Sequence, residues 1–386
     1  MMEADTLLIK NGLVLDPTNN FQGKTDLAIK DGRILGLGDF SQEKTNFMVD
    51  ATDCLVTPGL IDHHAHVYPF LATGIPSESC CFSSGVTTVV DAGSLGCDTY
   101  EQHVEFLNEG TLLDIKAYLN ISSTGLSTLP QLENMDPASF EEGKIRELFA
   151  KYPGKFEGLK LRTSKNIVGS YGLKPMEKTI QLAEKLQVPV MVHCTNPPEP
   201  LGEVIKMLRP GDILTHMYQN VGYTLLNNQG RVLEEAYRAR ERGVIFEAAD
   251  ARAHFSFEVS EQAIKEGFLP DIIATDLTQF SMFQRPTAFN LAMQISKYAY
   301  LGMDIYEVIK RCSQMPAQVM GLSGQIGCLS KGAWGDVAVF KKLTTGNEFG
   351  DRPYYESTKQ LRQGQYVYKP MLTVKKGKLV YRDILF

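Results

Sequence analysis

The chain has 386 residues, of which 43% are hydrophobic and 22% charged, and its formal net charge at pH 7 is −6. These values are ordinary for a soluble globular protein with a large core, and they exclude the basic surface that nucleic acids and anionic membranes require. We therefore expect the protein to bind a small-molecule substrate and to bind neither nucleic acid nor a membrane. The chain could also form a homo-oligomer.

The N-terminal residues 1–15 include Glu3 and Asp5 and have no basic region ahead of an apolar stretch, so no signal peptide is predicted. No apolar run approaches transmembrane length. The seven cysteines are scattered, odd in number and free of Cys-x-x-Cys spacing, which is typical of reduced, buried side chains. A cytoplasmic protein is expected.

Short apolar segments with turn dipeptides occur at both ends of the chain. Asn11-Gly12 and Asp31-Gly32 are typical hairpin turns, and similar segments return at 334–340 and 372–381. The sequence therefore predicts one small β-sandwich domain built from residues 1–56 and 325–386.

Between these segments, strands alternate with helices at a spacing that suits a parallel sheet. The predicted strands are Leu60–His66, Val86–Ala92, Ile115–Ile121, Phe156–Arg162, Val188–Cys194, Asp212–Met217, Val244–Ala249 and Ile272–Asp276. The clearest helices are 176–186, 231–242 and 256–267. This pattern predicts an α/β fold, a TIM (β/α)8 barrel over residues 57–324. A doubly wound open sheet competes, but no Gly-x-Gly-x-x-Gly follows an early strand.

The first of these strands ends in a histidine pair. Because side chains alternate along a strand, Asp62, His64 and His66 share one face, and the two imidazoles can converge on one cation. In a TIM barrel, catalytic residues gather at the C-terminal ends of the strands. Further candidates lie at or near later strand ends, namely Lys160, His193, His216 and Asp276.

These residues resemble the metal site of the amidohydrolase superfamily, specifically its binuclear members related to dihydroorotases, hydantoinases and N-acyl amino acid deacylases. The resemblance implies that His64, His66 and Asp276 bind one divalent metal ion and that His193 and His216 bind a second. It also implies that Lys160, carboxylated by carbon dioxide, bridges both ions. Oxygen and imidazole ligands favour zinc, with manganese, iron or nickel as alternatives.

Each residue also has a structural interpretation. His193 could be a core histidine, Lys160 a solvated lysine and Asp276 a helix cap. Lys160 shares its strand face with Arg162, however, and two inward cations need anionic partners, which a carbamate would supply. As a metal ligand, Asp276 would be the natural general base. His63 and His103 are expected to be structural or exposed.

Loops after the strands supply candidates for substrate binding. Arg162 could bind a substrate carboxylate through its guanidinium group, or form an internal salt bridge instead. The other candidates are Tyr218, Asn220, Arg252, His254 and Arg285.

Two differences from related enzymes narrow the range of expected reactions. Dihydroorotases carry an arginine two positions after the second histidine, where this chain has Tyr68. Mononuclear deaminases lack the bridging lysine and have a glutamate beyond the strand-five histidine, whereas His193 is followed by Cys194-Thr195-Asn196.

The sequence thus predicts a binuclear hydrolase that cleaves an acyl C–N or C–O bond of a small carboxylated substrate. An N-acyl amino acid or an O-acyl hydroxy acid fits. The alternatives are a cyclic amidase, an adenine deaminase-like enzyme and, remotely, a non-catalytic scaffold.

Overall fold

Eight parallel strands form the central sheet and follow one another in chain order. The computed structural model describes residues 6–45, 47–68 and 71–386. The strands are β6 (Leu60–Ala65), β7 (Val86–Ala92), β8 (Asp114–Asn120), β9 (Phe156–Arg162), β10 (Val190–His193), β11 (Ile213–Thr215), β12 (Ile245–Ala249) and β13 (Ile272–Ala274). A parallel bridge between Ala65 and Leu277 connects the segment after the last strand to the first strand. The predicted barrel is confirmed.

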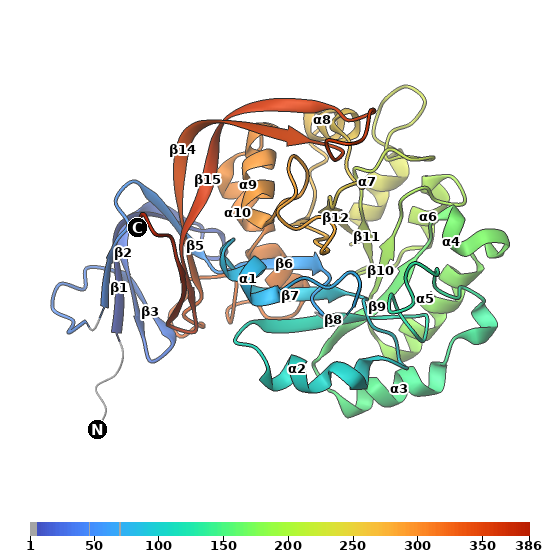
Figure 1. Ribbon diagram of the computed structural model, residues 1–386, viewed down its shortest axis with the longest axis horizontal. Helices are drawn as coiled ribbons and strands as arrows, with labels where there is room; N and C mark the ends of the chain where they lie inside the picture. The colour runs from blue at the N-terminus through green and yellow to red at the C-terminus, as the bar shows by residue number, and fades with distance from the viewer. Residues whose placement is uncertain (1–5, 46, 69–70) are drawn as a thin grey trace.

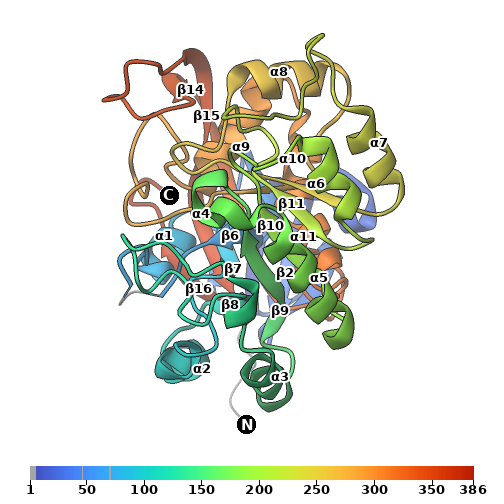
Figure 2. The same cartoon turned by 90° about the vertical axis from the view of Figure 1, so that its right-hand side faces the viewer.

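Helices surround this barrel, as Figures 1 and 2 show. They are α1 (Ser77–Phe82), α2 (Val104–Glu109), α3 (Glu142–Lys151), α4 (Lys165–Val168), α5 (Lys174–Leu186), α6 (Leu201–Met207), α7 (Glu234–Glu241), α8 (Phe257–Lys265), α9 (Leu291–Tyr300), α10 (Ile305–Arg311) and α11 (Gln314–Val319). The three helices predicted most clearly are confirmed as α5, α7 and α8. In α5, Pro175 lies in the first turn and Gln187 ends the helix in the left-handed conformation.

Strands from both ends of the chain form a second, mixed sheet. Its strands are β1 (Thr6–Asp16), β2 (Phe21–Lys30), β3 (Arg33–Gly38), β4 (Phe47–Asp50), β5 (Cys54–Pro58), β14 (Val337–Gly350), β15 (Leu361–Lys375) and β16 (Lys378–Arg382). Antiparallel pairing of β5 with β14 joins the two ends. The terminal β domain is thereby confirmed, whereas the bounds 1–56 and 325–386 stay predictions.

One predicted turn is wrong. Asp31-Gly32 forms the hairpin between β2 and β3, with both residues at positive φ. At Asn11-Gly12, β1 instead continues through an irregularity in its pairing with β2, and Asn11 has a φ of 65°. A positive φ in a single residue kinks a strand without reversing it.

The β14–β15 hairpin extends beyond the terminal sheet and passes over the barrel helices (Figure 1). On the way, Arg362 pairs with Glu261 of α8 at 2.8 Å, and the Tyr368 amide donates to Ser296 of α9. At the far end, Arg352 donates to Asn220 and to the Phe255 carbonyl oxygen. The hairpin therefore braces the loops after β11 and β12.

None of the helices in the described ranges has both the length and the apolar character needed to span a membrane. Residues 1–15, for which no signal peptide is predicted, belong to β1 from Thr6 onward. The first five residues lie outside the described part of the chain.

Candidate metal centre

The ends of β6 and β13 bring a first cluster of ligand atoms together. Asp276 Oδ1 lies 3.1 Å from His66 Nε2 and 3.4 Å from His64 Nε2. All three residues are buried. Two imidazole nitrogens and a carboxylate oxygen form a donor set that suits zinc or a similar divalent cation.

Three histidines form a second cluster beside the first. The ring centroids of His193 and His216 are 4.4 Å apart, and His254 stacks on His216 at 4.2 Å. His254 was predicted to contact substrate, yet the fold brings its ligand nitrogen into the same group as those of His193 and His216. His254 Nε2 is also 3.7 Å from Asp276 Oδ2, so the two clusters are contiguous.

Lys160 lies beside both clusters and is 2% exposed. Its Nζ is 3.4 Å from His64 Nε2, and burial lowers the pKa of the Lys160 ammonium group to about 8. A lowered pKa increases the fraction of neutral amine, which is the form that reacts with carbon dioxide. The side chain passes over Gly93, where an added Cβ would lie 2.5 Å from Lys160 Cγ.

The outer nitrogen of several histidines is held by a further residue. His64 Nδ1 is 2.8 Å from Glu247, His66 Nδ1 is 2.8 Å from Ser94, and His216 Nδ1 is 2.7 Å from the Ala249 carbonyl oxygen. Each contact turns Nε2 toward the site and fixes the tautomer that a metal ligand needs.

Glu247 was missed in the sequence analysis. It is fully buried, and its second oxygen is 2.7 Å from His63 Nδ1, so one carboxylate spans two neighbouring histidines. The pairing of β6 with β7 is irregular between Asp62 and Ala65, which explains how His63 and His64 both reach it. A glutamate inside the otherwise apolar predicted strand Val244–Ala249 was the available signal, because charged groups in buried strands need a partner.

The backbone is strained at two of the ligands. His216 has a φ of 64° and Asp276 a φ of 52°, a left-handed conformation that residues other than glycine rarely adopt. Strain of this kind persists where the surrounding structure demands it, often at functional sites. His216 directly follows β11 and Asp276 lies two residues after β13, and the turns there bring both side chains into the ligand clusters.

Protonation states also suit a cation. Burial lowers the pKa of His193 and of His216 well below the usual value, which keeps both rings neutral. Burial alone would raise the pKa of Asp276, but nearby His64 and hydrogen bonds from His64 and His66 hold it well below the usual range. In addition, His216 Nε2 is buried without a hydrogen-bond partner among the described residues. The neutral rings of His193 and His216, the ionised carboxylate of Asp276 and this orphaned nitrogen all fit bound metal.

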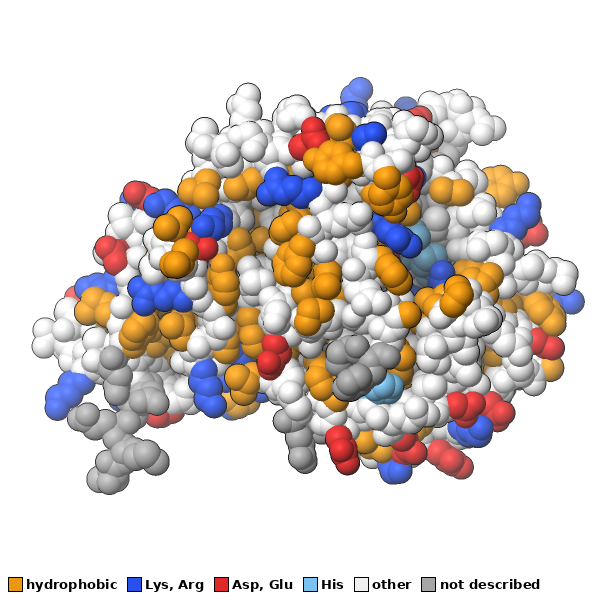
Figure 3. All heavy atoms as spheres, viewed as in Figure 1, with side chains coloured by type: hydrophobic (Ala, Val, Ile, Leu, Met, Phe, Trp, Pro, Cys, Tyr) orange, Lys and Arg blue, Asp and Glu red, His pale blue; other side chains and the backbone are white. Residues whose placement is uncertain are grey.

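A cavity of about 250 Å³ opens onto these clusters. Figure 3 shows a hollow with histidine side chains at its base and basic side chains beside it. The wall contains Leu126, Leu129 and Phe280 together with Arg162 and Arg252. An apolar wall with two cations suits a small organic anion.

The two arginines differ in their partners. Arg162 Nη1 lies 3.0 and 2.9 Å from the two carboxylate oxygens of Glu133, a residue that is 4% exposed. Arg252 is exposed and contacts the face of Phe280 at 5.4 Å, with no carboxylate partner among the described residues. The internal salt bridge considered for Arg162 is therefore present, and Arg252 is the uncommitted cation.

Three predicted substrate contacts lie away from this cavity. The Tyr218 side chain is fully buried and its hydroxyl donates to the Phe268 carbonyl oxygen. Asn220 accepts from Arg352, and Arg285 donates to Asn347 beside another pocket. The expectation that these side chains line the site is corrected, because loop position alone does not determine where a side chain points.

Comparison with known proteins agrees with this geometry. The model of the amidohydrolase family matches residues 55–380, which include both clusters and Lys160. The chain belongs to the amidohydrolase family. It is therefore a hydrolytic enzyme, and this family generally depends on two metal ions.

Individual members of the family are similar over most of their length. A deacetylase of Agrobacterium fabrum is 33% identical over 338 residues, which is 86% of this chain and 81% of that protein. A crystal structure of an adenine deaminase superposes with a TM-score of 0.88 at 25% identity and covers 99% of this chain and 100% of that one. A crystal structure of a dihydroorotase gives 0.87 at 29% identity, with 98% of both chains covered.

Proposed function

We propose that this amidohydrolase is a binuclear deacylase that hydrolyses an acyl C–N or C–O bond of a small carboxylated substrate, such as an N-acyl amino acid or an O-acyl hydroxy acid. The observation that carries the proposal is the unpaired Arg252 in the wall of a 250 Å³ cavity whose floor holds both ligand clusters. The name of the Agrobacterium relative, deacetylase, supports the same reaction.

The two clusters define the proposed metal sites. His64, His66 and Asp276 would hold one ion, and His193 with His216 would hold the other. A carboxylated Lys160 would contribute one oxygen to each ion, and zinc is the ion that these ligands favour. When bound in this way, two divalent cations would polarise the acyl carbonyl group and activate a water molecule.

The residues of the chain would divide the remaining tasks. Asp276 is ionised, and its Oδ2 lies 3.7 Å from His254 Nε2 where the two clusters meet, so this carboxylate would accept a proton at Oδ2 and pass it to the leaving nitrogen or oxygen. Arg252 would pair with the substrate carboxylate. Leu126, Leu129 and Phe280 would exclude water around the acyl group.

A substrate panel tests the reaction. Metal-loaded enzyme is assayed with N-acetyl-D- and L-amino acids, acetylated hydroxy acids, dihydroorotate, hydantoins and adenine, together with analysis of bound metal. We expect close to two divalent ions per chain and turnover of the acetylated acids. Turnover of adenine alone, or of cyclic amides alone, would replace this proposal with one of the two alternatives.

Carboxylation of Lys160 has its own test. Enzyme reconstituted with metal and ¹³C-labelled bicarbonate should show a carbamate carbon signal, and Lys160→Ala should lose that signal together with most of the metal and activity. Acetate or propionate at high concentration, with excess metal, should partly restore metal binding by replacing the bridging oxygens. An unmodified amine at Lys160 in active, metal-loaded enzyme would contradict the bridge.

A further inference from the structure

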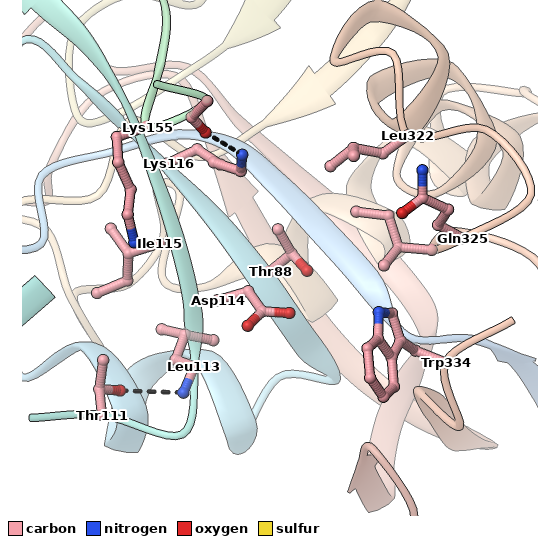
Figure 4. A pocket seen from close by; sticks show the side chains of 12 residues that line it. Thr88, Thr111, Leu113, Asp114, Ile115, Lys116, Lys155, Leu322, Gln325 and Trp334 are labelled. Carbon is pink, nitrogen blue, oxygen red and sulfur yellow. Dashed lines mark hydrogen bonds between the residues drawn. The ribbon is translucent and has the colours of Figure 1, made fainter. Parts of the chain in front are cut away.

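A second cavity, of about 340 Å³, lies at the end of the barrel opposite the metal centre. One wall comes from the first residues of β7 and β8, and the other from the segment between α11 and β14 (Figure 4). We call this cavity the basal pocket and define it by Thr88, Asp114, Lys116, Leu322, Gln325 and Trp334.

The two walls differ in chemistry. In Figure 4 the side chains of Thr88, Asp114 and Lys116 point across the cavity toward the opposite wall. Leu322 and Trp334, together with Ile326, make that opposite wall largely apolar. A molecule that fills the basal pocket must therefore have a polar end and an apolar body.

One buried polar group in the pocket has no partner. Thr88 is 1% exposed, and its hydroxyl has no hydrogen bond to any described residue. Burying a hydroxyl without a hydrogen-bond partner is unfavourable, and at a cavity wall a bound ligand can supply the missing partner.

The remaining polar groups are rich in unused donors. Asp114 is already paired with Lys375 and Lys376, at 2.7 and 2.8 Å. Lys116 donates one N–H to the Gly154 carbonyl oxygen and lies 3.7 Å from Glu157, which leaves further N–H groups available. The indole N–H of Trp334 has no acceptor in the described part of the chain. Lys116 and Trp334 therefore keep donors that no acceptor among the described residues uses, and an anionic ligand would supply acceptors for them.

We propose that the basal pocket binds a small monocarboxylate with an apolar body, independently of the catalytic site. Its carboxylate accepts hydrogen bonds from Lys116 and Thr88, and its apolar body packs against Leu322 and Trp334. The ligand occupies the face of the barrel that the metal centre does not use.

The sequence supplies a local reporter, because Trp334 is the only tryptophan. Phenylacetate is titrated into the whole enzyme while tryptophan fluorescence and thermal unfolding are followed. We expect a saturable change in fluorescence and a rise in Tm, both unchanged in Arg252→Met, which removes the cation of the catalytic cavity. Phenylacetamide, which has the same body without the charge, should bind at least about tenfold more weakly.

Two substitutions locate the binding site. Thr88→Val, which keeps the shape, should raise the Kd for phenylacetate about threefold, and Lys116→Met about tenfold. Lys151→Met is the matched control, because Lys151 is exposed on α3 and paired with Glu101; it should leave the Kd unchanged. If Lys116→Met fails to fold, Thr88→Val decides.

The proposal is overturned by any of three results. These are the absence of both a saturable fluorescence change and a Tm shift, equal responses in wild type and Thr88→Val, and a response that disappears in Arg252→Met. The last result would place the phenylacetate in the catalytic cavity.

Discussion

The two arginines of the cavity differ in whether a carboxylate of the protein already neutralises their charge. Arg162 and Arg252 both line the cavity, but Arg162 is paired with the buried Glu133 and Arg252 is not. A cation with a buried partner maintains the fold, because removing it leaves an uncompensated charge. An unpaired cation at a cavity wall is available to a ligand.

Substitution of the two arginines should therefore separate binding from stability. Arg252→Met should lower kcat/KM for carboxylated substrates by about 5- to 30-fold, equivalent to about 1–2 kcal/mol, and spare their neutral methyl esters. Arg162→Met should lower stability by about 3 kcal/mol with no change in the charged-to-neutral ratio. Steady-state kinetics and urea unfolding measure the two effects.

The double variant Arg162→Met, Glu133→Gln is the control for this comparison. It removes both charges, so it should recover much of the lost stability. If Arg162→Met instead lowered kcat/KM only for the charged substrates, Arg162 would be the residue that contacts the substrate carboxylate.

Glu247 provides a second prediction for a single residue. Glu247→Gln keeps the shape but presents an amide N–H to His63 or His64, so the orientation and basicity of His64 should suffer. We expect about 10- to 100-fold weaker metal binding, measured by competition with a chelator. Glu157→Gln, a change at another largely buried glutamate that contacts no ligand histidine, is the control. Equal metal affinity in the two variants would limit Glu247 to a structural role.

Among the elements, the strand ends and the loops after them build the site. β7 ends at Ala92, and the next residue, Gly93, turns with a φ of +83° directly under Lys160. The absence of a side chain there allows the Lys160 stem to cross toward the ligands. A glycine after one strand thus sets the position of a lysine on another.

Gly93→Ala should displace Lys160. Its Cβ would lie 2.5 Å from Lys160 Cγ, in addition to the cost of a positive φ, so metal content and stability should both fall. Gly211→Ala is a matched control, because Gly211 has a φ of +87° and open space around its Cβ position. It should lose only about 1 kcal/mol and keep its metal. Normal metal content in Gly93→Ala would show that the lysine stem can shift without loss.

At the scale of the whole molecule, buried charges join the barrel to the terminal sheet. Lys375 of β15 is 2% exposed and lies 2.6 Å from Asp336 and 2.7 Å from Asp114 of β8. Asp336 is itself 1% exposed. One lysine therefore neutralises a carboxylate on each side of the contact.

Loss of this lysine should destabilise the whole chain. Lys375→Met leaves Asp336 buried without its cation, and we expect a loss of about 3–5 kcal/mol in the free energy of unfolding. Lys376→Met, at a neighbouring lysine whose side chain is 37% exposed and paired with Asp114, should cost less than about 1 kcal/mol. Urea unfolding measures both, and equal losses would show that the Asp336 pair contributes no more than a surface pair.

The sequence by itself determined the barrel and most of the residues that form the two ligand clusters. Alternation along strands and the common direction of parallel strands are local properties, so the ends of successive strands could be located without coordinates. His64, His66, His193, His216, Lys160 and Asp276 therefore converge as expected.

Only the tertiary structure decided which side chains surround those clusters. His254 joins the second histidine group, Glu247 spans two histidines, Glu133 takes Arg162, and Tyr218 turns into the core. Each of these contacts joins loops or strands far apart in the sequence, and no local pattern specifies the direction of a loop side chain. The same reason applies to the β14–β15 hairpin, whose course across the barrel depends on pairs such as Arg362 with Glu261 that only the closed fold brings together.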